Sequence, residues 1–331
     1  MIDHFQSKTI ELIKPLIPPD AEDRVNRSFK QWNQIVREHI RTSTGLKLSD
    51  KDGTWSVPVK VVDGFPLRFA ELINQYDDPV LWRLIVGQPK LGAMVEGAQF
   101  ILNSWTEIES WPSLPKKWKQ MARPVERTRD FAMALQQLAI AEKVKKEIRK
   151  INEDLLGAYF IKESRVELYW IPIAMIAAMT DVRIEDLTIV VLIHELAHGY
   201  THVGSDIDGR QWDTKGFASS ALEVVEGLAQ FYTHVITDHL ASRTPGPQEA
   251  FRKLLSLQSG PYQTHQKWID KQPDRTGEIV RFTMVSARNT GAVDYPAWRR
   301  VFSRAASSLT RKKQPTGIGM FADSSDQDTQ S

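Results

Sequence analysis

The feature that most constrains this chain is the pentapeptide HELAH at residues 194–198, which directly follows an almost unbroken apolar run at residues 187–193. Residues four apart lie on one face of an α-helix, so the imidazoles of His194 and His198 can converge on a single metal ion. Glu195 lies about 100° round the helix, where it can reach a water molecule rather than the metal. The pattern therefore predicts a buried helix that carries two ligands and one base.

The residues on either side of this motif predict its structural context. Acidic Glu185 and Asp186 suit the N-terminus of the motif helix, and Gly199 marks a position where the helix is expected to loosen or end. Upstream, residues 158–161 and 166–171 are rich in aromatic and β-branched side chains and predict a β-hairpin. We expect residues 166–171 to be the strand to whose edge an extended peptide adds: an edge open to solvent would favour a peptide substrate, whereas an edge covered by the N-terminal helices would favour a closed or regulated state.

A third ligand is expected from a helix predicted over residues 217–236. Two glutamates compete for this role. Taking 100° per residue, Glu226 lies about 40° beyond Leu222 at the border of the apolar stripe, whereas Glu223 lies about 100° beyond it. A carboxylate against an apolar face is costly unless it is paired or bound to metal. Glu226 is therefore the favoured ligand, with Glu223 as its substitute and an ordinary salt bridge of Glu226 as the alternative.

With this second glutamate, the sequence resembles a known superfamily. HELAH at residues 194–198 followed by EGLA at residues 226–229 resembles the zincin metallopeptidases, in their glutamate-liganded branch, the gluzincins. The resemblance covers roughly residues 157–240. It implies Zn²⁺ bound by the two histidines and Glu226, with Glu195 as the general base that activates water for peptide-bond hydrolysis.

The chain departs from the gluzincin pattern at two places. The gap between His198 and Glu226 is longer than in thermolysin-like enzymes, which predicts an inserted loop over residues 203–216. Such enzymes often carry an aspartate one turn after the ligand glutamate, whereas this chain has Gln230. We expect the Gln230 amide to accept a hydrogen bond from a ligand histidine, and to raise that ligand's basicity less than a carboxylate would.

The metzincin branch is excluded by the residues that follow the motif. It requires a glycine and a third histidine where this chain has Thr201 and Gly204. His202 continues the four-residue rhythm after His198 and becomes an alternative ligand only if the helix breaks at Gly199. On an unbroken helix, His202 lies about 12 Å along the axis from the first histidine.

A peptidase of this kind also needs a hydrogen-bond donor to the oxyanion of its transition state. Tyr262, His265 and Tyr295 are the catalytic candidates downstream of the ligand helix, and His234 is nearer in sequence. For each of them alone, packing in the core or ordinary exposure is the plain alternative.

Composition limits the remaining classes of function. The 331 residues carry a net charge of +2, which gives no general attraction to nucleic acid or an anionic membrane. We therefore expect a peptide or protein substrate and neither of those partners. The chain has no cysteine, so zinc must be bound through nitrogen and oxygen. No secretory signal is recognisable, and the longest uncharged apolar run, residues 168–179, is too short to span a bilayer, so a cytoplasmic location is expected.

The overall expectation is a predominantly helical α+β protein, a zincin-like unit with a small sheet and an N-terminal helical region. Residues 1–122 are expected to form the mostly helical N-terminal region, with one strand through Trp55, Val57, Val59 and Val61. Residues 123–310 form the expected catalytic region, including a long scaffold helix over 125–156 that is capped by Gly157. Residues 311–331 are polar and predict a disordered tail. Further helices are predicted at residues 5–16, 21–41, 67–75, 92–108, 249–258, 261–271, 278–288 and 295–309.

Two other functional classes remain open from sequence. One is a regulatory or interaction protein that retains a zincin fold with weak or no hydrolysis. The other is a zinc hydrolase that acts on a non-peptide amide, because one fold can support several chemistries through the shape of its pocket.

Overall fold

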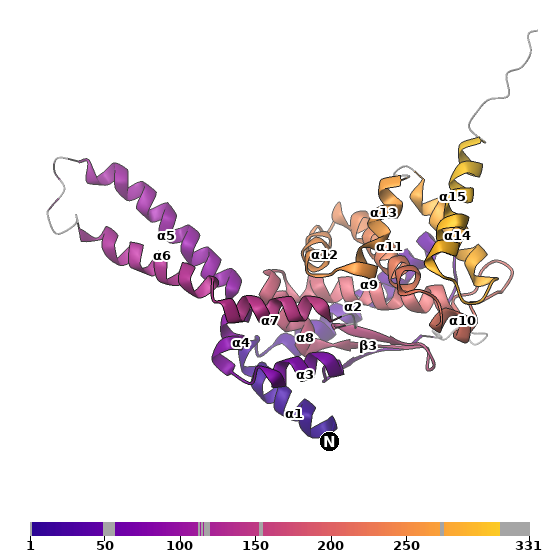
Figure 1. Ribbon diagram of the computed structural model, residues 1–331, viewed down its shortest axis with the longest axis horizontal. Helices are drawn as coiled ribbons and strands as arrows, with labels where there is room; N and C mark the ends of the chain where they lie inside the picture. The colour runs from indigo at the N-terminus through magenta and orange to yellow at the C-terminus, as the bar shows by residue number, and fades with distance from the viewer. Residues whose placement is uncertain are drawn as a thin grey trace, which may run out of the picture.

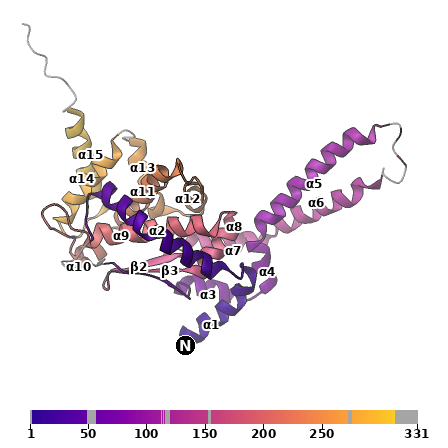
Figure 2. The same cartoon turned by 180° about the vertical axis from the view of Figure 1, so that it is seen from behind.

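The computed structural model describes residues 2–48, 57–111, 113, 115, 120–151, 155–271 and 275–311. The chain is predominantly helical and has one three-stranded mixed sheet, which confirms the expected fold class. A body of packed helices and the sheet contains most of the chain, and a pair of helices projects from it as an arm (Figure 1). The same arm stands clear of the body in the view from behind (Figure 2).

The sheet contains the predicted hairpin and a third strand from far upstream. Strands β2 (Gly157–Phe160) and β3 (Arg165–Tyr169) pair antiparallel, and β1 (Val59–Val62) pairs parallel with the other side of β3. The order β1-β3-β2 makes β3 the central strand. The prediction that residues 166–171 form a free edge is therefore wrong, because β1 occupies that edge and leaves β2 as the outer strand beside it. The Trp55 end of the predicted upstream strand lies outside the described residues.

Helix α8 (Trp170–Thr180) begins directly after β3 and was not predicted. The sequence analysis assigned Trp170 and Ile171 to a strand because both are apolar and favour β-structure. The run continues without a polar side chain, however, and Pro172 lies in the first turn, where a missing N–H is tolerated. Within the described ranges, no helix combines the length and the apolar character needed to cross a membrane.

The motif helix α9 (Ile184–Val203) is the centre of the body. Nearly all of its residues are buried, as the apolar run predicts, and α2 (Ala21–Thr44), α8, α11 (Leu222–Ala241) and α12 (Gly246–Leu257) pack round it. The expectation that α9 loosens at Gly199 is wrong, because the helix continues to Val203. Gly199 serves close packing instead: a Cβ atom there would lie 3.2 Å from the side chain of Val57.

The long scaffold helix predicted over residues 125–156 is also wrong. It is two helices, α6 (Ala122–Gln136) and α7 (Ala139–Lys150), separated at Leu138, whose ψ of 116° is extended. Helix α6 packs along α5 (Gln88–Glu109) to form the arm, while α7 lies on the body against α3 (Leu67–Gln75) and α4 (Pro79–Val86). Gly157 does not cap a helix but begins β2. The apolar positions of the predicted helix therefore belong to two separate packing faces.

The remaining elements complete the body. The helix expected over residues 217–236 is divided into α10 (Thr214–Ala218) and α11, and residues 204–213 form the expected loop. One apolar core extends from Ile13 to Ala305, so the first and last parts of the body share it. Beyond Arg311, the predicted tail lies outside the described residues. The other helices are α1 (Ile2–Ile13), η1 (Lys14–Leu16), η3 (Gly260–Gln263), α13 (Thr264–Lys271), α14 (Thr276–Arg288) and α15 (Tyr295–Arg311).

Candidate metal centre

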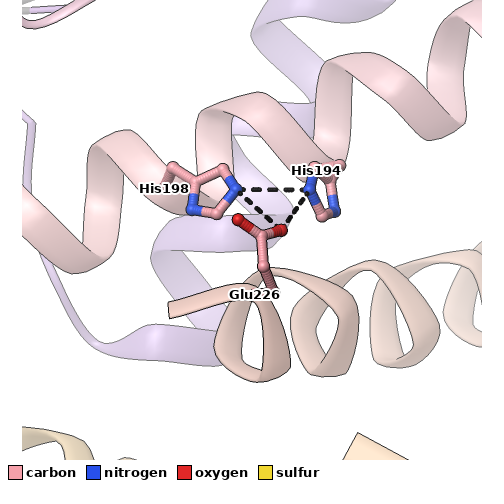
Figure 3. Close-up of side chains that lie close together, drawn as sticks. All are labelled: His194, His198 and Glu226. Atoms are coloured by element: carbon pink, nitrogen blue, oxygen red, sulfur yellow. Dashed lines mark hydrogen bonds and ion pairs between the residues drawn. The ribbon is translucent and has the colours of Figure 1, made fainter. Parts of the chain in front are cut away.

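Three side chains from two helices meet at one point in the body (Figure 3). His194 and His198 point from consecutive turns of α9 towards Glu226 on α11. Their Nε2 atoms are 3.2 Å apart, and the Glu226 Oε2 atom lies 3.3 Å from the first and 3.5 Å from the second. All three residues are buried, with at most 8% of any one exposed.

These distances match the donor set of a zinc ion. With metal–ligand bonds of about 2.0–2.1 Å, two ligand atoms of a tetrahedral zinc are separated by about 3.3 Å. The triangle of His194, His198 and Glu226 has three sides close to that length. A single metal ion can therefore contact all three donors, with a fourth position open to water. Glu226 rather than Glu223 completes the group, as the helical geometry predicted.

The charge of Glu226 suits this role. Burial alone would raise the pKa of its carboxyl group. The adjacent His198 and His194 more than offset burial and hold that pKa well below its ordinary value. The group is therefore a carboxylate, the form that binds a cation, although it is largely buried. Next to it, Gly227 leaves room for the Trp268 ring, since a Cβ atom would lie 2.7 Å from that ring.

The predicted base, Glu195, is buried beside the start of β2. Its residue is 2% exposed, and a Cβ atom on Gly157 would lie 2.9 Å from the Glu195 Cγ atom. The absence of a side chain at Gly157 thus makes the space that the Glu195 side chain occupies. This contact crosses from strand to helix, so the sequence analysis, which read Gly157 as a helix cap, did not find it.

Two cavities adjoin the three ligands. A cavity of about 70 Å³ reaches His194 and Glu195, and its walls are mainly apolar residues of α7, α8, α9 and α12, including Ile148, Ile176, Val190, Leu254 and Leu257. A second cavity of about 120 Å³ reaches His198 and Glu226 and is lined also by Tyr159, Ile161 and Val225. The three candidate ligands, called the metal group below, therefore border one cavity at His194 and another at His198.

The three candidate oxyanion donors occupy different places. The Tyr262 ring is buried and stacks 6.2 Å from the His194 ring, where it lines the cavity beside Glu195. Tyr295 begins α15 and packs against the apolar core. His265 is fully buried, and burial lowers its pKa to about 4, so its imidazole is neutral at neutral pH.

A neutral His265 is poorly suited to donate to an oxyanion. Its Nδ1 atom lies 3.1 Å from the backbone carbonyl of Tyr262, an acceptor, so the ring proton belongs on Nδ1. The Nε2 atom is then unprotonated and cannot donate. His265 therefore supports the backbone of Tyr262, and Tyr262 is the candidate that borders the metal group.

Tyr159 on β2 is a site residue that the sequence analysis missed. Its ring stacks on the His198 ring with centroids 6.3 Å apart, and its hydroxyl lies 2.8 Å from Nδ1 of His202. The other His202 nitrogen lies 3.2 Å from the Thr214 hydroxyl. His202 is thus engaged by two hydroxyl groups one turn beyond the ligands, and it is not part of the metal group. The only sequence signal for Tyr159 was its place in the predicted strand.

Gln230 makes a different contact from the one expected. Its Nε2 atom donates to the Gln258 side-chain oxygen at 3.0 Å, and both residues line the cavity beside Glu195. The Gln230 amide is 2% exposed. Gln230 therefore places a polar group in a cavity lining that is otherwise mainly apolar.

Comparison with known proteins adds no relative to this picture. No protein-family model, no curated protein and no solved structure matches the chain. The function of the chain must therefore be inferred from the chemistry of its own site.

Proposed function

We propose that this protein is a zinc-dependent metallopeptidase. The observation that carries the proposal is the near-equilateral triangle of His194 Nε2, His198 Nε2 and Glu226 Oε2, with Glu195 on the adjoining helical position. Two imidazoles and one carboxylate form a nitrogen and oxygen donor set that suits zinc in a catalytic site. In a chain without cysteine, this set is also the kind of zinc site that the composition allows.

The residues around the triangle have separable roles in such a reaction. Bound zinc would supply Lewis-acid polarisation of the substrate carbonyl and acidify a water molecule. Glu195 takes the proton of the attacking water and then delivers it to the leaving amine. Tyr262 borders the same cavity and is the side chain best placed to donate to the oxyanion. Because Gly157 has no side chain, the Glu195 side chain has room to occupy its position.

The outer edge of β2 supports an extended peptide as the substrate. The Tyr169 N–H donates to the Leu156 carbonyl, so in this antiparallel register the backbone groups of Gly157 and Tyr159 point away from β3. These two residues are also the ones beside Glu195 and His198. A peptide that adds to this edge would run along the metal group.

The cavity beside Glu195 indicates the side chain that such a substrate carries. Because Glu195 must protonate the leaving amine, the residue that supplies this amine lies on the Glu195 side of the metal. The cavity there is mainly apolar and about 70 Å³ in volume. Apolar walls favour an apolar side chain at that substrate position. The second cavity, beside His198, would accept a side chain on the carbonyl side.

The proposal is tested with Glu195→Gln, which removes the base and keeps the shape. The wild type, loaded with zinc, should cleave members of a mixed peptide library before apolar residues. The variant should retain zinc and lose activity by about 10²–10⁴-fold. An unchanged rate in the variant would remove Glu195 from the mechanism. A wild type that binds zinc and cleaves no peptide would favour a regulatory protein with a zincin-like site.

A further inference from the structure

The arm formed by α5 and α6 projects from the body (Figures 1 and 2), and much of its apolar surface is uncovered. The two helices pack along each other, yet Ala98 is the buried residue of α5 and Ala132 that of α6. The large side chains of the arm that are exposed include Met94, Phe100, Ile101, Phe131 and Met133. A helix pair with so few fully buried residues gains limited stability from its own contacts.

Helix α5 carries two apolar seams rather than one. The seam that packs on α6 runs through the buried or half-buried positions Leu91, Val95, Ala98, Leu102 and Trp105. A second seam has the same alternating steps of three and four residues and consists of Met94, Gly97, Ile101, Ser104 and Ile108. A narrow seam at this spacing is the pattern with which one helix packs along another.

The second seam is open at its centre. Met94 is 48% exposed and Ile101 is 51% exposed, and nothing lies within 4 Å of the position that a Cβ atom on Gly97 would take. A groove along another side of the arm mixes charged and polar side chains, among them Glu96, Asn103 and Arg129, with the apolar Val95, Phe100 and Met133. The second seam, by contrast, contains no charged residue and offers a side along which another helix could approach.

We infer that the second seam of α5 pairs with the same seam of a second copy of this chain. An antiparallel pair with its two-fold axis beside Gly97 brings Met94 of each copy opposite Ile101 of the other. The small glycine at the centre lets the two backbones approach, and it is flanked on both sides by large apolar residues. The centre of the seam, from Met94 to Ile101, is thus complementary to itself, which a two-fold interface requires.

The charges and the length of α5 also support a second copy of the chain as the partner of this seam. The seam residues carry no charge, while Lys90 lies at one end of α5 and Glu107 and Glu109 lie at the other. An antiparallel pair therefore places opposite charges near each other at both ends. At 1.5 Å per residue, α5 is about 33 Å long, so two copies of the helix can meet along several turns.

The absence of natural cysteine allows a direct test. Light scattering of the full-length wild type should give twice the chain mass of 37.8 kDa. With Gly97→Cys, mild oxidation should link two chains through the single cysteine at the axis. Asn103→Cys lies outside the second seam of the same helix and should therefore give far less of the cross-linked dimer. A cross-link that forms equally well at both positions would overturn the proposed register.

A second variant tests the seam without a cross-link. Met94→Glu combined with Ile101→Glu places four carboxylates in the paired seam and should weaken dimerisation at least about 100-fold. The variant should keep the circular dichroism spectrum and zinc content of the wild type, because the arm lies outside the body. A wild type that is monomeric at every concentration would overturn the inference and assign the seam to another partner. A dimer that persists in the double variant would also overturn it.

Discussion

Helices α9 and α5 have a similar sequence character, but α9 is enclosed by its own chain whereas α5 is largely exposed. Both are long, both are rich in apolar residues, and neither has one simple apolar face. Nearly every residue of α9 is buried, whereas Ala98 is the buried residue of α5. Apolar character on several sides therefore indicates that a helix needs several neighbours, but not whether these come from its own chain.

The difference has consequences for function. A helix held on all sides keeps His194 and His198 in fixed rotamers, which a metal site with side lengths of 3.2–3.5 Å requires. A helix with one open seam is free to exchange partners. We therefore assign chemistry to the body and association to the arm, and the following changes test that division.

The largest difference should come from truncating one apolar side chain in each helix. Leu192→Ala in the fully buried part of α9 should lower the free energy of unfolding by about 2–5 kcal/mol. Phe100→Ala in α5, where the side chain is 72% exposed and lies outside the second seam, should change it by less than about 0.5 kcal/mol. Urea unfolding measures the free energy of unfolding of both variants, and equal losses would contradict the difference between α9 and α5.

The next effect should come from Gly157, where strand and helix meet. Gly157→Ala places a methyl group 2.9 Å from the Glu195 Cγ atom, so the base must move. We expect kcat/KM to fall about 100-fold, the effect of displacing a catalytic group by about 1 Å. The zinc content should stay that of the wild type, since the ligands are untouched. Gly97→Ala in the arm, which meets no atom of its own chain within 4 Å, is the matched control and should leave kcat/KM unchanged.

The smallest effect should come from the ion pair that joins α2 to the start of α9. The Arg24 guanidinium hydrogen-bonds to Glu185 at 2.8 Å and lowers the pKa of that carboxyl group from 4.5 to about 2. The folded state thus binds this proton more weakly than the unfolded state. The stabilisation is complete above pH 4.5 and is lost as the pH falls towards 2.

Arg24→Gln tests this ion pair. Because both side chains are about a quarter exposed, we expect a loss of roughly 0.5–1 kcal/mol at neutral pH and a shallower decline of stability between pH 4.5 and 2. Arg129→Gln removes an ion pair to an exposed aspartate in the arm and provides the control. Thermal unfolding across this pH range measures the stability of both variants. A steeper loss of stability on acidification in Arg24→Gln would contradict the predicted direction of the pH effect.

The metal group could be predicted from sequence because it depends on helix geometry. A spacing of four residues places His194 and His198 together, and the apolar stripe of α11 distinguishes Glu226 from Glu223. Tyr159 and Gly157 could not be found in this way. Their roles come from contacts between β2 and α9, which a local pattern does not contain.

The fold shows the same limit. The predicted hairpin and most helices are present because local periodicity specifies them. The sheet order was missed because β1 pairs with a strand about 100 residues away, and the break at Leu138 was missed because apolar residues from two packing faces happened to continue one helical period. Long-range packing decides both features.

The most direct test of the central claim is the metal content of the purified protein after zinc loading and removal of loosely bound ions. We expect one zinc ion per wild-type chain, and a large loss in both His194→Ala and Glu226→Gln. Glu223→Gln, one helical turn earlier on α11, should retain the full amount. Zinc retained in Glu226→Gln at wild-type affinity would contradict the proposed centre.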